Sequence, residues 1–132
     1  MVHALQVAVA GMGAVRIALG LAPFVAAGPL SRVLGFPAQH DSPTTRLMAR
    51  LFGVRDVGLG VIAFFVLRHP DLLVPMAVFQ AFMDGGDLVS MAIPLLRRDG
   101  IDRGAWRSSA FAATGAISWL VVLGVAVSPI AG

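Results

Sequence analysis

The sequence predicts an all-α protein: a four-transmembrane-helix bundle with both termini on the non-cytoplasmic side of the membrane. Of the 132 residues, 58% are hydrophobic and 13% are charged, and the mean hydropathy is +0.86, well outside the usual range of a soluble domain. Four apolar stretches also approach the length of about 20 residues that an α-helix needs to cross the hydrocarbon core. A chain of this length forms one domain, so residues 1–132 are predicted to be a single integral membrane domain.

Turn and capping residues set the expected ends of the helices. Gly28 and Pro29 are expected to stop the first helix. Ser42 and Pro43 mark the start of the second, because serine accepts a hydrogen bond from a free backbone N–H and proline suits the first helical position. Pro70 ends it, since the residue before a proline avoids helical geometry. The predicted helices span about residues 4–27, 43–67, 71–97 and 104–128.

The connections predict which helices are neighbours. Only about five residues separate the second helix from the third, so these two are expected to pack as antiparallel neighbours. Gly100 is a candidate for the residue that follows the third helix, and Asp102 is a candidate cap for the fourth.

The arginines outside the spans indicate the orientation. One side of the predicted membrane carries seven of them and the other side carries Arg68 alone, and positively charged loops stay in the cytoplasm. Both arginine-rich loops are therefore predicted to be cytoplasmic, with both termini outside, in the cell membrane. The seven are Arg32, Arg46, Arg50, Arg97, Arg98, Arg103 and Arg107.

Five ionisable residues fall inside the predicted spans: Arg16, Arg55, Asp56, Asp84 and Asp87. A charge at that depth costs at least a few kcal/mol unless it faces the bundle interior and has a partner. At about 1.5 Å of rise per residue, four of the five lie in one layer roughly 13–18 Å from the cytoplasmic boundary. We therefore expect the charges to meet near the membrane midplane.

Helical spacing indicates which faces carry these charges. The favoured pairs are Arg16 with Asp84 or Asp87, and Arg55 with whichever aspartate remains. Arg55 points about 100° away from Asp56, so it is expected to serve a different neighbour. Polar residues that are candidates for hydrogen bonds between helices are Gln80, which shares the aspartate face, together with Ser90, Thr114 and Ser118. Small residues expected to permit close helix contact are Gly13, Gly20, Gly53, Gly60 and Ala63.

Three interpretations of the charge cluster stay open: a structural network, an ion or ligand path, and a catalytic or redox role. In the first, the arginines and aspartates form a structural network that fixes how the helices pack. In the second, the cluster forms part of an ion or ligand path. Three carboxylates face two guanidinium groups, and the least costly remedy in a low dielectric is for one aspartate to hold a proton. A proton-labile carboxylate in the membrane is typical of relays and coupled carriers.

Composition excludes several other functions. The absence of cysteine excludes disulfides, thiolate catalysis and iron–sulfur clusters. Asp84 and Asp87 alone offer too few ligands for a hard cation, and the three histidines lack metal-ligand spacing, so neither a metal nor a cofactor is predicted. The net charge is only +3, with most arginines at membrane boundaries, which argues against nucleic-acid binding. The expected partners are the lipid bilayer and either another membrane protein or a second copy of this chain.

Short motifs resemble those of a known group of membrane proteins. The stretch from Arg16 to Gly20 followed by Leu34-Gly35-Phe36-Pro37, and the segment from Arg50 to Gly60, resemble DoxX-like and related small four-helix bacterial membrane proteins. An aspartate pair in the third helix fits the same pattern. The resemblance implies a four-helix bundle, and some members are linked to quinone-dependent redox chemistry. That activity is not carried over, because this chain has no cysteine and no pair of haem ligands at one depth.

The sequence therefore favours a small structural or accessory membrane protein, more likely not an enzyme. A proton-linked carrier or relay for a small molecule is the first alternative. A membrane subunit of a quinone-linked redox system is the second.

Overall fold

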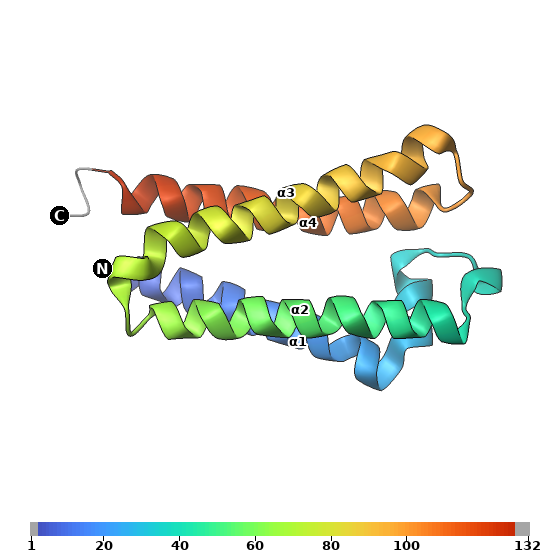
Figure 1. Ribbon diagram of the computed structural model, residues 1–132, viewed down its shortest axis with the longest axis horizontal. Coiled ribbons are helices and arrows are strands. Elements are labelled where there is room, and N and C mark those ends of the chain that lie inside the picture. The colour runs from blue at the N-terminus through green and yellow to red at the C-terminus, as the bar shows by residue number, and fades with distance from the viewer. Residues whose placement is uncertain (1–2, 129–132) are drawn as a thin grey trace.

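The computed structural model describes residues 3–128, which form four long α-helices and two short 3₁₀ turns without a β-strand. The all-α prediction is thus confirmed. The helices make two hairpins that lie side by side, with the start of α1, the end of α4 and the α2–α3 connection at one end (Figure 1). We call this the terminal end and the opposite one the loop end. The elements are α1 (His3–Leu34), η1 (Ala38–His40), α2 (Pro43–Val66), η2 (Pro70–Leu72), α3 (Leu73–Arg97) and α4 (Asp102–Ala126).

Three segments are long and apolar enough to cross a membrane: α1, the segment from η2 through α3, and α4. This indicates a membrane protein. The helix α2 differs because Arg50, Arg55 and Asp56 interrupt its apolar sequence. A charged residue inside a span must be satisfied by other parts of the protein, so α2 depends on its neighbours for its polar partners.

The helix α1 does not stop at Gly28 as predicted but continues to Leu34 after a break at Ala26, where φ is −147° and ψ is 49°. Inside a regular helix, the Pro29 ring would clash with the carbonyl of the residue four positions earlier. The break at Ala26 removes that regular turn, and Pro29 then stands in the first turn of the next helical segment, where proline is tolerated. The proline therefore bends the helix instead of ending it.

The connections agree with the sequence at one helix start and differ at two other places. Ser42 caps α2 as predicted, since its Oγ accepts a hydrogen bond from the backbone N–H of Thr45 at 3.1 Å. The residue that directly follows α3 is Arg98, in the left-handed region with φ of 55°, and Gly100, which also has a positive φ of 80°, lies two residues further on. Asp102 does not cap α4 but is its first residue, where its negative charge favours the positive end of the helix dipole.

Close packing occurs mainly within the hairpins, between α1 and α2 and between α3 and α4, whereas α2 and α3, predicted to be antiparallel neighbours, touch only slightly. Glycines explain the α1–α2 pairing. A Cβ at Gly20 would lie 2.8 Å from the backbone nitrogen of Val57, and a Cβ at Gly60 would lie 2.7 Å from the carbonyl oxygen of Gly13. Small residues thus let the two backbones approach closely.

The two hairpins meet differently along their length. At the terminal end, an apolar core from all four helices joins them; its members include Val9, Ala63, Val66, Met76 and Trp119. At the loop end, the Phe36 ring lies against Gly104, and Arg107 Nη1 donates to the carbonyl of Val33 at 2.5 Å. Between these two regions, the contact between hairpins is made by charged and polar side chains.

Candidate functional site

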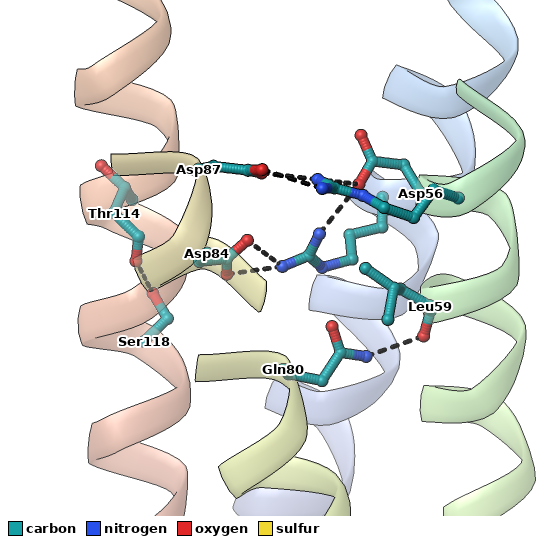
Figure 2. A network of polar contacts seen from close by, with 9 residues as sticks. Asp56, Leu59, Gln80, Asp84, Asp87, Thr114 and Ser118 are labelled. Carbon is teal, nitrogen blue, oxygen red and sulfur yellow. Dashed lines mark hydrogen bonds and ion pairs between the residues drawn. The ribbon is translucent and has the colours of Figure 1, made fainter. Parts of the chain in front are cut away.

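Arg16, in the middle of α1, links the two hairpins through Asp84 and also binds Asp56, and both aspartates are labelled in Figure 2. Its Nη2 donates to both carboxylate oxygens of Asp84 on α3, each at 2.5 Å. Its Nη1 donates to Asp56 Oδ1 on α2 at 3.0 Å. One guanidinium group therefore joins three helices, and the pairing of Arg16 with Asp84 is one that the sequence favours.

Arg55 forms the second pair. Its Nη1 and Nη2 donate to the two oxygens of Asp87 on α3, at 2.8 and 2.5 Å. This two-point geometry is the strong form of the arginine–carboxylate interaction. Arg55 Nη2 also lies 3.7 Å from Asp56 Oδ1. As expected from the 100° offset, Arg55 and its neighbour Asp56 contact different helices: Arg55 binds Asp87 on α3, and Asp56 binds Arg16 on α1.

The five residues form one line of alternating charge. Its order is Asp84, Arg16, Asp56, Arg55 and Asp87, and we call it the ion network. Three carboxylates and two guanidinium groups give it one excess negative charge when all are ionised. Burial is uneven: the Asp84 side chain is 5% exposed, whereas Asp56 and Asp87 are 27% and 21% exposed. The ion network therefore has a buried end at Asp84 and a more accessible end at Asp87.

Gln80 lies one helical turn before Asp84 and is fully buried. Its Nε2 donates to the backbone carbonyl of Leu59 at 2.8 Å, which adds a further bond between α3 and α2. Its Oε1 is buried and, within residues 3–128, has no hydrogen-bond partner. In Figure 2 this oxygen points toward the level of Asp84, while the nitrogen faces Leu59.

The helix α4 takes part through Gly115, which the sequence reasoning missed. A Cβ at Gly115 would lie 3.0 Å from Asp84 Cγ and still closer to one of its oxygens, so only glycine leaves room for the carboxylate. Counting residues from the loop end along α3 and α4 would have shown that Gly115 lies at the depth of Asp84. Gly115 is 13 residues from Asp102 at the start of α4, and Asp84 is 13 residues from Arg97 at the end of α3.

Three polar residues were expected to form hydrogen bonds between helices, but they do not. Ser90, Thr114 and Ser118 each donate to a carbonyl four residues earlier in their own helix. A short hydroxyl side chain satisfies itself in this way when no partner is within reach on a neighbouring helix.

A second polar region lies at the loop end, away from the ion network. A hollow of about 160 Å³ there is bordered by Arg32, Phe36 and Asp41, among others. Asp41 accepts two hydrogen bonds from Arg46, at 2.7 and 2.8 Å, and these hold the pKa of the exposed Asp41 carboxyl below its usual value of 3.8. Within residues 3–128, no group of three or more His, Cys, Asp or Glu residues is placed to hold a metal ion.

No protein-family model matches this chain, and no curated protein or solved structure matches it significantly. The resemblance to DoxX-like proteins therefore stays a prediction. What the chain does must be argued from the ion network itself.

Proposed function

We propose that this chain is a small structural or accessory protein of the cell membrane, with four spanning helices and both termini outside. The observation that carries the proposal is the position of the ion network. It joins α3 to α1 through Arg16 and Asp84, and α3 to α2 through Arg55 and Asp87. Most other close contacts lie within the hairpins, so these pairs are the polar links that hold the hairpins together between the apolar core at the terminal end and the contacts at the loop end.

The expected cost of breaking these ion pairs supports a role in holding the two hairpins together. Removing one partner of a buried ion pair leaves an uncompensated charge and costs about 3–5 kcal/mol. The partly exposed Arg55–Asp87 pair should cost less than that, but still a large part of the stability of a small bundle. The pair is also the more accessible end of the ion network, so it can be exchanged without crowding the core.

A charge exchange tests this role. Arg55→Asp and Asp87→Arg should each lower the folded yield in mild detergent, because each places two like charges together. The double variant should recover much of the loss. Arg50→Asp is the matched control, since Arg50 is exposed on the same helix. If the double variant folds no better than the single variants, or if these are harmless, the ion network does not fasten the hairpins.

The proposed topology has a direct test, because the chain contains no cysteine. Asp71→Cys marks the α2–α3 connection and Asp99→Cys the α3–α4 connection, which lie at opposite ends of the bundle. A maleimide that cannot cross membranes should label the first variant on intact cells. It should label the second only after the cells are opened. The reverse pattern would contradict the proposed orientation.

A proton-linked carrier or relay is the second candidate, and a specific observation favours it. The ion network holds one more carboxylate than guanidinium groups, and the accessible Asp56 and Asp87 connect through the arginines to the buried Asp84. Binding one proton would neutralise the excess charge. This function predicts a protonated aspartate near neutral pH.

A further inference from the structure

We infer that the proton of the ion network resides on Asp84 and that Gln80 Oε1 accepts the hydrogen bond from the protonated carboxyl. The inference rests on the second candidate function, since it assumes that the ion network binds one proton. It goes further by naming the residue that holds the proton and the group that receives its O–H.

Of the three aspartates, Asp84 is the one for which a negative charge is least well compensated. It is the most buried of the three side chains. Only one nitrogen, Arg16 Nη2, contacts it, whereas Asp87 receives two nitrogens of Arg55 and Asp56 lies near both arginines. Since each guanidinium contact favours the ionised form and burial disfavours it, the least costly proton is the one on Asp84.

A buried neutral carboxyl needs an acceptor for its O–H, and Gln80 provides one. Residues four apart share a face of a helix, so Gln80 lies directly below Asp84 on α3. The Gln80 amide nitrogen is held by its bond to the carbonyl of Leu59, which leaves Oε1 buried and without a partner on the face of α3 that also carries Asp84. An acceptor that is buried without a partner destabilises the fold, and a donor from Asp84 would remove that cost.

The groups that face Asp84 from the neighbouring helices are compatible with a neutral Asp84 carboxyl. The helix α4 contributes Gly115, which lies against the carboxyl and brings no charge. With Asp84 neutral, the remaining two carboxylates balance the two guanidinium groups, and Arg16 can still donate to the carbonyl oxygen of Asp84. The charged groups facing Asp84 are Arg16 from α1, Arg55 and Asp56 from α2, and Asp87 from α3.

Infrared spectroscopy of the purified full chain in detergent tests the inference. A protonated carboxyl gives a C=O band that shifts in D₂O and lies apart from the bands of ionised carboxylates. We expect this band at neutral pH in the wild type. In Gln80→Met it should move to higher frequency or disappear, because the O–H loses its acceptor. Gln6→Met is the matched control, since it makes the same exchange in α1 ten residues, or about 15 Å, before Arg16.

Replacing any one aspartate by asparagine removes the excess charge, so each of those variants should lose the band and none identifies the residue. The Gln80 variant makes that assignment. A wild-type band that Gln80→Met leaves unchanged would place the proton elsewhere and overturn the inference, while the proton-linked function stands. No protonated carboxyl at neutral pH would overturn both.

A second measurement decides the case if Gln80→Met fails to fold. Carboxyl ¹³C NMR of wild-type protein labelled at its aspartate side chains distinguishes protonated from ionised groups one by one. The Asp84 signal is identified by its loss in Asp84→Asn. A protonated shift for Asp84 at neutral pH supports the inference, and an ionised shift overturns it.

Discussion

Replacing Gly60 by alanine should separate the first hairpin, and the structure gives the size of the effect. The added Cβ would lie 2.7 Å from the carbonyl oxygen of Gly13 and 2.6 Å from Ile17 Cγ1. An ordinary contact begins at 3.4 Å, so α1 and α2 must move apart by about 0.7 Å. A gap of that size forfeits roughly a quarter to a half of each dispersion contact along the shared face.

The cost of overpacking at Gly60 exceeds the gain in helix propensity that alanine brings. Overpacking costs about 1–3 kcal/mol, and alanine in place of glycine returns roughly 0.5–1 kcal/mol through helix propensity. We therefore expect Gly60→Ala to lower the free energy of unfolding by about 1–2 kcal/mol. The assay is reversible unfolding in mixed micelles of rising dodecyl sulfate content, followed by circular dichroism.

Gly58 provides the matched control, because it is two residues away on α2 and a Cβ there meets nothing within 4 Å. Gly58→Ala should be neutral or stabilising by up to about 1 kcal/mol. If Gly60→Ala is as stable as Gly58→Ala, close backbone contact does not hold α1 against α2, and the reasoning is refuted.

Two further predictions concern Asp84 and Asp41. Gly115→Ala should displace the Asp84 carboxylate and cost about 1–3 kcal/mol in the same unfolding assay, whereas Gly124→Ala, on the same helix with open space beside it, should not. The hydrogen bonds from Arg46 lower the pKa of Asp41 in the folded protein, so their stabilising effect is present at neutral pH and is lost as the pH falls through that lowered pKa. Arg46→Gln should return the Asp41 pKa toward 3.8 in an NMR titration, and an unchanged value would contradict the assignment.

The sequence was sufficient for the features that depend on local chemistry and on depth in the membrane. The cap at Ser42 follows from two adjacent residues. The meeting of Arg16 with Asp84 follows from their distance along each helix to a common boundary. In both cases the deciding quantity, a short-range hydrogen bond or a rise per residue, can be read from the order of the residues.

Features that depend on three-dimensional packing could not be predicted in the same way. Pro29 suggested a helix end, but a helix can also continue past a proline when the preceding turn opens, as it does at Ala26. The short α2–α3 connection suggested that these helices pack as antiparallel neighbours. The closest approach instead follows the glycine faces, and those pair α1 with α2.

The composition of the ion network separates a mechanical role from a chemical one. Two pairs, Arg16 with Asp84 and Arg55 with Asp87, already join α3 to both helices of the first hairpin. Asp56 adds no new link between the hairpins, because its contacts are to arginines of α1 and α2. It does connect the two pairs into one line and supplies the excess negative charge. Under the proposal that the ion network binds a proton, Asp56 is therefore the residue that creates the excess charge which the proton would neutralise.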